Sequence, residues 1–563
     1  MTIHFINRTD NKGVVKVLSL MLSLMILILS GCSGNAEKSA NKKTEKPQTT
    51  TPDVSSDPAG DTDEDANDDT DDADSSQSSL TADYKLQNGE YLSDISSVLP
   101  RGDTDEFKYR YSENLVCNSK TGVVQKSEIS NTVVSKRKEI MNSKSPKYNV
   151  KGTTYYISPG GNDDNDGLSP EKPKRTLNDL YLQLGDAVLF ERGSVFRLTE
   201  SIVAVPYVTY GAYGTGEKPH IYASPKNYAK KSLWTPTKKK NVWRVDFPYK
   251  DAGNIVFNHG EDAGVKKQGG INQLTANGYF YHNADDAYLY LYFDKGNPAD
   301  YYKDIEICSD ISIFVLNSDV SGVKIDNLAL MYSSRHGVSC ANANNYVEIT
   351  NCIVAWIGGT GNPTRHGNGI QWWNAAHDNK VENCWLYQIF DSAISPQGEL
   401  GGNYYNFDFK NNLIEYCCCG YEMWDHDKEN KGLNFDNIRI ENNILRASAY
   451  GFGNRSYDDG IRGIEGHIRF AVDADTLGSK GVYILNNIFE TSYCSNVKWP
   501  EVGLKAGGNV HVKGNSIYQS ATHYTVKPDV YFDDVEYFVT DQAGLETAWK
   551  AFDSEPAVIK WLE

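Results

Sequence analysis

Short apolar stretches separated by Asn and Gly recur along the second half of the chain. Seven copies read apolar, any residue, Asn, often a second Asn, then apolar again. The third position of the copies falls at Asn327, Asn351, Asn383, Asn411, Asn442, Asn486 and Gly514. Repeats of this size, rich in β-forming residues, predict a solenoid in which each copy is one coil stacked on its neighbours.

A strand is predicted after each of these turns, and its side chains should alternate between two faces. The copies begin at Gly337, Gly369, Ala393, Gly420 and Gly451, and their second position is always apolar. That position should face the core, so the third and fifth positions should face outward. Glu422 is a third position, and we expect it on the outer face between Ser395 and Gly453.

The outward positions near Glu422 have the chemistry of a sugar-binding surface. Tryptophan rings stack on pyranose rings, while amides, guanidinium and imidazole groups hydrogen-bond to sugar hydroxyls or carboxylates. The alternative for each tryptophan is packing beneath a long loop. The candidate substrate-binding residues are Gln371, Trp373, Gln397, Trp424 and Arg455 in the strands, with His366 and His426 in flanking turns.

The repeat resembles the right-handed parallel β-helix of pectate-lyase-like proteins, in which asparagines stack at a turn. The stretch "TTYYISPGGNDDNDGLSPEKPKRTLNDLYLQLGDAVLFERGSVFR" resembles the opening coil of bacterial carbohydrate-active β-helix proteins. The resemblance covers residues 151–520. It implies an all-β fold, with residues 85–150 as an N-terminal cap or extension and residues 521–563 as a C-terminal cap. It also implies a polysaccharide or oligosaccharide as the partner.

Glycoside hydrolysis is the favoured activity, on a plant or microbial glycan. It needs two carboxyl groups, about 5 Å apart for retention or about 6.5–9.5 Å apart for inversion. Glu422 is the first candidate, and Glu399 and Asp391 are candidates for the second. On a flat strand Asp391 would lie roughly 14 Å from the Glu422 column.

Two other activities stay open at this point. A uronate lyase would use Arg455 as its base, and a surface protein that only binds glycans would need no catalytic pair. The fold alone does not choose between these classes.

One loop has the spacing of a calcium site. Asn162, Asp164 and Asp166 alternate before Gly167, as in calcium-binding loops. Turn formation by Asx side chains explains the same pattern. Calcium is therefore one alternative for this loop, and the sequence indicates no other cofactor.

The first 84 residues predict export rather than a folded domain. Lys12 and Lys16 precede an apolar run and then Cys32, which is typical of a lipoprotein signal peptide over residues 1–31 with Cys32 as the lipidated residue. Residues 32–84 are predicted to be a disordered linker, and residues 53–74 contain 11 acidic residues and no basic one. The sequence contains no basic patch for nucleic acid. We expect an extracellular monomer that is anchored to the bacterial membrane.

Overall fold

The computed structural model describes residues 115–117, 124–127, 129–260, 262–361, 365–454, 466–519 and 527–562. Chain contacts divide the protein into the units Met1–Thr70 and Asp71–Glu563, and all described residues belong to the second. Cys32, the predicted signal peptide, the predicted linker and Arg455 therefore lie outside the described residues. No helix of the described residues is both long and apolar enough to cross a membrane.

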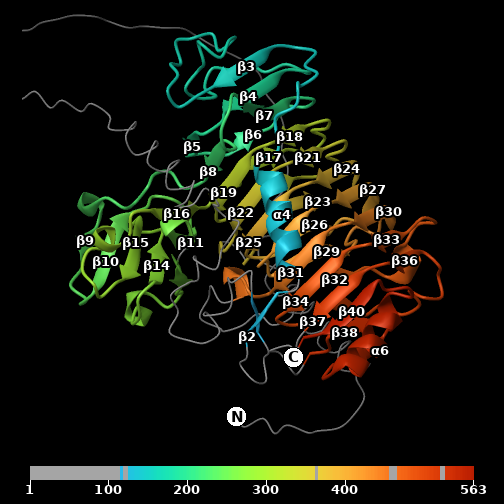
Figure 1. The fold of residues 1–563 in the computed structure, drawn as a ribbon. Coiled ribbons are helices and arrows are strands. Elements are labelled where there is room, and N and C mark those ends of the chain that lie inside the picture. The colour runs from blue at the N-terminus through green and yellow to red at the C-terminus, as the bar shows by residue number, and fades with distance from the viewer. Residues whose placement is uncertain are drawn as a thin grey trace, which may run out of the picture. The chain divides into compact units, whose positions relative to one another are not determined.

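Three sheets, built almost wholly of parallel strands, form a right-handed β-helix, the fold that the resemblance implies (Figure 1). Each full coil contributes one strand to each sheet in turn. Sheet 1 contains β3 (Thr154–Ile157), β4 (Ala187–Glu191), β7 (Thr209–Tyr213), β18 (Lys324–Asp326), β21 (Glu348–Thr350), β24 (Ala376–Glu382), β27 (Gly402–Lys410), β30 (Leu433–Glu441), β33 (Val482–Leu485) and β36 (Val510–Lys513).

The other two sheets continue the same coils. Sheet 2 contains β5 (Val195–Arg197), β8 (His220–Tyr222), β11 (Ala252–Phe257), β12 (Asp262–Ala263), β16 (Ile305–Ser309), β19 (Ala329–Ser333), β22 (Ile353–Ile357), β25 (Trp385–Ile389), β28 (Leu413–Glu415), β31 (Ile444–Ser448), β34 (Ile488–Ser492), β37 (Ser516–Gln519) and β40 (Val558–Trp561). Sheet 3 contains β6 (Ile202–Val203), β17 (Phe314–Leu316), β20 (Val338–Cys340), β23 (Ile370–Trp373), β26 (Ser392–Gly398), β29 (Cys419–Asp425), β32 (Ile468–Ala471), β35 (Val497–Trp499), β38 (Val530–Phe532) and β39 (Val535–Tyr537).

The repeated asparagines make the turn between sheets 1 and 2. The first Asn of each copy has a left-handed backbone, with φ between 53° and 60°, and Gly514 takes the same place with φ 74°. Asn tolerates this conformation better than other side chains, which explains the motif. The second Asn points inward and forms a ladder, in which the Oδ1 of Asn443 accepts the Asn412 N–H and the Oδ1 of Asn487 accepts the Asn443 N–H, both at 2.9 Å.

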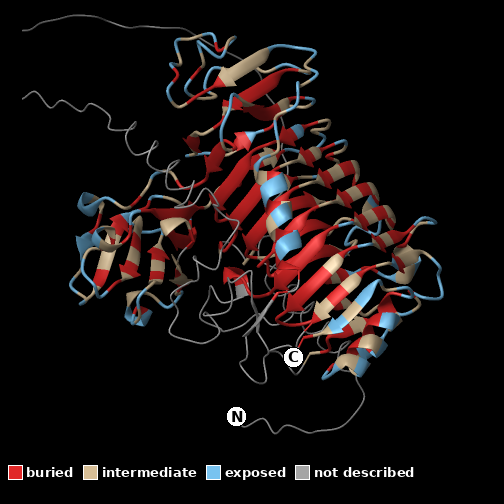
Figure 2. Ribbon diagram, in the orientation of Figure 1, coloured by how far each residue is buried: buried red, intermediate tan, exposed pale blue. Residues whose placement is uncertain are grey.

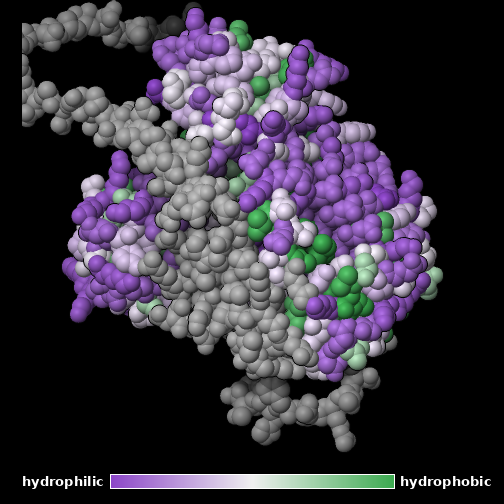
Figure 3. Space-filling view, viewed as in Figure 1, coloured by the Kyte–Doolittle hydropathy of each residue, from purple (hydrophilic) through white to green (hydrophobic). Residues whose placement is uncertain are grey.

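Helices cover the C-terminal end and one side of the solenoid. Helix α6 (Gln542–Phe552) places Leu545, Trp549 and Phe552 in the main core at the C-terminal end of the solenoid. Helix α4 (Ser130–Met141) instead lies on the outer face of sheet 2, where Arg137 forms a buried ion pair with Glu415. The outer face of sheet 1 is hydrophilic and is purple in Figure 3.

A module is inserted between β8 and β16. Its antiparallel sheet is ordered β13 (Val265–Lys266), β14 (Tyr279–Asn283), β15 (Tyr288–Tyr292), β10 (Val242–Asp246), β9 (Thr235–Pro236), and only the β13–β14 pair is parallel. One face of this sheet packs on a separate core that includes Phe247, Phe280, Leu289 and Leu291. We call residues 224–304 the inserted module.

The register of sheet 3 confirms the predicted alignment for four coils and corrects the fifth. Gln371 pairs with Ser395, Trp373 with Gln397, and Gln397 with Trp424. The fifth coil is different because Phe452–Asn454 forms a 3-10 helix (η5), and Phe452 packs outside the solenoid against Trp356. The strand beside β29 is β32, so Arg469, not Gly453, lies opposite Glu422.

Candidate active site

A cavity of about 660 Å³ lies on the outer face of sheet 3. Eight residues predicted from the sequence line it: His366, Trp373, Asp391, Gln397, Glu399, Glu422, Trp424 and His426. Arg365, Asp425, Leu433, Arg469, Ala471 and Asp473 complete the lining. Strands β23, β26, β29 and β32 supply the floor, and the turns at both ends of these strands supply the walls. We call this space the sheet 3 cavity.

Glu422 is fixed in the floor of the sheet 3 cavity by three side chains. Its Oε2 accepts hydrogen bonds from Ser392 Oγ at 2.8 Å and Ser395 Oγ at 3.2 Å. Its Oε1 is 2.5 Å from Nη1 of Arg469. Only 3% of the residue is exposed. Every one of these contacts donates hydrogen to the carboxylate, and such contacts favour its ionised form.

A chain of amides continues from the Glu422 carboxylate along the floor. The Nε2 of Gln397 donates to Oε1 of Gln371 at 2.8 Å, and Asn368 Nδ2 donates to the same oxygen at 2.8 Å. The Asn368 N–H donates to Nδ1 of His336 at 3.0 Å. Burial lowers the pKa of His336 to about 3, so this ring is a neutral acceptor. Gln371 therefore orients Gln397 from beside the cavity.

Two tryptophans stand on the same column as Gln397. The rings of Trp373 and Trp424 are 5.9 Å apart and nearly perpendicular, and Trp424 meets the His426 ring at 4.8 Å. Both tryptophans are partly exposed where they line the cavity. They are therefore not buried beneath a loop, and they can present apolar surface to a sugar ring.

Asp391 precedes Ser392, the residue that hydrogen-bonds to Glu422. The chain turns at this residue, where the Asp391 N–H donates to the Gly367 carbonyl and the Cys419 N–H donates to the Asp391 carbonyl. The next residue, Ser392, bonds directly to Glu422. Asp391 and Glu422 both line the sheet 3 cavity.

The other carboxyl groups of the cavity have different surroundings. Asp425 accepts the N–H groups of Gly401 and Asp427 and the hydroxyl of Tyr404, which ties the loops at the rim. Glu399 pairs with Lys428 at 2.7 Å, and both side chains are exposed. Asp425 therefore has a structural role, whereas Glu399 stays accessible at the rim.

Sequence reasoning missed Arg469 and Asp473. The alternation Ile468-Arg469-Phe470 is the signal that could have placed Arg469 on the outer face.

Asp473 lies beside Glu501, whose pKa is raised to about 7 by burial and by the hydrogen bond and negative charge of Asp473. A carboxyl group that is partly protonated at neutral pH thus stands next to the cavity wall.

The predicted calcium loop is a set of Asx turns. Asn162 Oδ1 accepts the Asp164 N–H at 3.1 Å, and Asp166 Oδ1 accepts the Leu168 N–H at 3.0 Å. These oxygens hold the turn itself, as the alternative reading expects. Among the described residues, no group of three or more His, Cys, Asp or Glu side chains could hold a metal ion.

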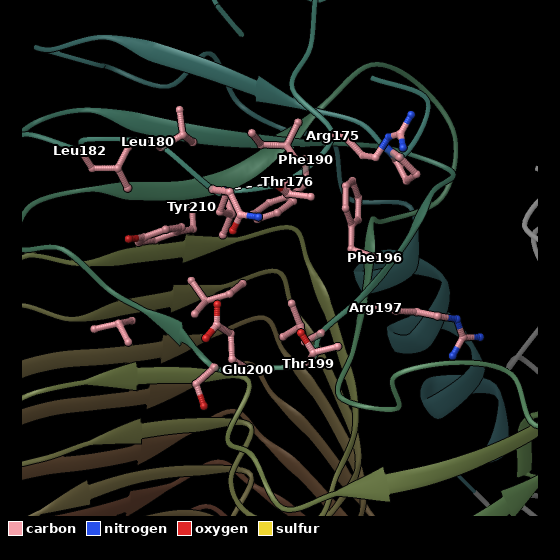
Figure 4. Close-up of a pocket in the computed structure, with 18 of the residues that line it drawn as sticks. Arg175, Thr176, Leu180, Leu182, Phe190, Phe196, Arg197, Thr199, Glu200 and Tyr210 are labelled. Carbon is pink, nitrogen blue, oxygen red and sulfur yellow. Dashed lines mark hydrogen bonds between the residues drawn. The ribbon is translucent and has the colours of Figure 1, made fainter. Parts of the chain in front are cut away.

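A larger cavity, of about 900 Å³, lies at the N-terminal end of the solenoid (Figure 4). Leu180, Leu182, Phe190, Phe196 and Tyr210 line it, and they belong to or border the main core. One of its charged side chains, Arg197, is paired with Glu306 at 2.7 Å. This space is the end of the apolar core, and it lacks the converging carboxyl groups of the sheet 3 cavity.

The chain is similar to solved structures at low sequence identity. No family model and no curated protein matches the chain. Similar solved structures include a "Glycoside hydrolase" (11% identity, TM-score 0.41, 73% of this chain and 96% of that chain) and "XylC with xylose" (12%, 0.39, 65% and 68%). Another is "pectate lyase Pel9A" (11%, 0.30, 65% and 80%). The parallel pairing of strands in three sheets shows by itself that the protein is a parallel β-helix.

Proposed function

We propose that the protein is a glycoside hydrolase that cleaves a plant or microbial glycan in the sheet 3 cavity. The observation that supports this most directly is the setting of Glu422. Its carboxylate is held by Ser392, Ser395 and Arg469 in the floor of a cavity that also exposes two tryptophans. A fixed anion beside aromatic surface is what a developing sugar cation needs.

Asp391 is the proposed second carboxyl group. Support comes from its place in the lining of the same cavity as Glu422, and the proposed pair is that of an inverting enzyme, in which a water molecule lies between the base and the sugar. Glu422 is the general base because its hydrogen-bond donors keep it ionised. Asp391 is the general acid that protonates the leaving oxygen. Trp373, Trp424, Gln397, His366 and His426 are the proposed contacts to the substrate.

The test is turnover of a panel of polysaccharides and of aryl glycosides by the purified chain. We expect new reducing ends without unsaturated uronates, and a first product of inverted anomeric configuration by NMR. Glu422→Gln should lower kcat at least 10³-fold on every substrate. Asp391→Asn should be slow on polysaccharides but much closer to wild type on glycosides with an activated leaving group, because these need no protonation.

Glu399, the accessible carboxyl group at the rim of the cavity, provides the matched control for Asp391. Glu399→Gln should change kcat less than threefold if Asp391 is the acid. If Glu399→Gln shows the leaving-group dependence instead, the acid is assigned wrongly. Unsaturated products would indicate a lyase, and glycan binding without any turnover would indicate a binding protein.

We also propose that the chain is a cell-surface lipoprotein anchored through Cys32 to the bacterial membrane. Support comes from the basic flank, the apolar run and the small residues before Cys32. Metabolic labelling with an alkynyl fatty acid should tag the wild type and not Cys32→Ala. Equal labelling of both would overturn the assignment.

A further inference from the structure

The inserted module has an outer face made of tyrosines. Strands β14 and β15 alternate strictly: Phe280, His282, Leu289 and Leu291 are buried, while the residues between them are half-exposed. Figure 2 shows the same alternation in colour on these strands. The outward residues include Tyr279, Tyr281, Tyr288, Tyr290 and Tyr292. We call these five residues the tyrosine face.

The rings of the tyrosine face lie beside one another across the two strands. Tyr281 pairs with Tyr290 in the sheet, and their rings are stacked with centroids 6.3 Å apart. Tyr288 and Tyr290 are neighbours along β15 with centroids 6.2 Å apart. None of the five belongs to the core of the module or to the residues packed against it. A row of rigid rings that combine apolar area with hydroxyl groups is suited to recognition, and core packing does not explain it.

Two cations belong to the same face. The guanidinium of Arg244 lies 4.3 Å from the centre of the Tyr288 ring, and Lys267 Nζ lies 3.9 Å from the Tyr279 ring. Among the described residues, no carboxylate forms an ion pair with Arg244. Aromatic contact holds its guanidinium in place and leaves N–H groups for an anion.

The net charge of the module points to the same class of ligand. Residues 224–304 contain twelve Lys and Arg and nine Asp and Glu, a net charge of +3, although the whole chain carries −18. The module is thus basic although the chain as a whole is acidic. Its charge would attract an anionic polymer.

We propose that the tyrosine face is a second glycan-binding site, which takes a polysaccharide that carries carboxylate groups. Sugar rings of a uronic-acid polymer would stack on Tyr281 and Tyr290, and a carboxylate would bind Arg244 through paired hydrogen bonds. The described residues that line the sheet 3 cavity lie outside the module. The site therefore goes beyond the proposed hydrolase function and does not depend on it.

Affinity electrophoresis of the full chain tests this site. Gels contain polygalacturonate, a highly methyl-esterified pectin or a neutral xylan at matched concentrations. We expect polygalacturonate to retard the wild type and Glu422→Gln equally, and the esterified pectin and xylan to retard them at least tenfold less. The double variant Tyr281→Ala/Tyr290→Ala should lose at least tenfold in affinity for polygalacturonate.

Two further variants separate the site from general effects. Arg244→Gln, which keeps the aromatic face, should weaken binding about fivefold and flatten its salt dependence. Tyr181→Ala changes a tyrosine that is 82% exposed outside the module and should have no effect. Thermal melts check that each variant is folded. The proposal is overturned if no polymer retards the wild type, or if neutral xylan retards it as strongly as polygalacturonate does. It is also overturned if polygalacturonate retards Tyr281→Ala/Tyr290→Ala and Arg244→Gln as strongly as the wild type.

Discussion

Arg469 lies on the coil that follows Glu422, directly opposite it in the register of sheet 3, and forms an ion pair with it at 2.5 Å. The guanidinium stabilises the ionised carboxylate that the proposed mechanism needs. We expect Arg469→Gln to lower kcat by about 10²-fold, as the loss of an electrostatic contact in a closed site does. The acid limb of the pH–rate profile should move to higher pH.

Arg469→Lys is the matched control for that prediction. It keeps a positive charge, so the acid limb should move less than in Arg469→Gln. An unchanged limb in Arg469→Gln would show that Glu422 does not act as the ionised base.

The two tryptophans should act on substrate affinity. We expect Trp373→Ala and Trp424→Ala each to raise KM about tenfold, or 1.4 kcal/mol, with kcat changed less, because ring contact is present before and during the reaction. Trp→Phe at each position keeps a ring and should raise KM only a few-fold. Initial rates over a series of substrate concentrations separate the effect on KM from the effect on kcat. A fall in kcat alone would contradict the stacking role.

The asparagine ladder should contribute strongly to stability. Asn443 accepts from Asn412, and its Nδ2 donates to Asn487 and to the Phe409 carbonyl. Asn443→Ala leaves buried polar groups unsatisfied and should lower the free energy of unfolding by about 3 kcal/mol. Guanidinium titration at pH 7 measures this.

The neighbouring residue gives an internal control for the ladder. Asn442 has φ 56°, so Asn442→Gly should be nearly neutral, whereas Asn442→Ala should cost about 1 kcal/mol. If Asn442→Ala and Asn443→Ala lower the free energy of unfolding equally, the ladder is not the main contribution of these asparagines to stability.

The ion network under α4 should also contribute strongly to the stability of the fold. Glu415 is buried between Arg137 and Arg446, at 2.5 and 3.1 Å. Burial alone would raise the pKa of Glu415, but these two guanidinium groups outweigh it and lower the pKa. Glu415→Gln removes the carboxylate that Arg137 and Arg446 share, although Arg446 keeps its pair with Glu490 at 2.7 Å, and it should cost about 3–5 kcal/mol. Lys380→Ala, which breaks a partly exposed surface pair with Glu348, should cost under about 1 kcal/mol.

Three buried histidines make stability fall in acid. Burial lowers the pKa of His220, His336 and His467 to about 3, from an ordinary value of 6.5. Between pH 6.5 and 3 the unfolded chain binds protons that the folded chain does not, so stability is lost as pH falls through this window. Each histidine contributes up to about 1.4 kcal/mol per pH unit there. Denaturant midpoints of unfolding at pH 7 and pH 5 check this. His336→Asn should reduce the difference between the two midpoints.

Local patterns in the sequence are sufficient for the coils and for the outward position of Glu422. Asparagine tolerates φ near +55°, and strand side chains alternate, so the turns and the register of β20, β23, β26 and β29 follow from residue order alone. The fifth coil shows the limit of this reasoning. Phe452 has the apolar character of an interior position, but it packs outside the solenoid on Trp356.

Only the tertiary structure decided which groups meet Glu422. Arg469 and Ser392 are 47 and 30 residues away in the chain, and they reach the carboxylate because coil stacking and the turn at Asp391 bring them there. The tyrosine face likewise forms only when β14 and β15 pair with Tyr281 opposite Tyr290. Alternation along one strand is a local property that a sequence can show, whereas contacts between strands depend on how many residues each connecting loop contains.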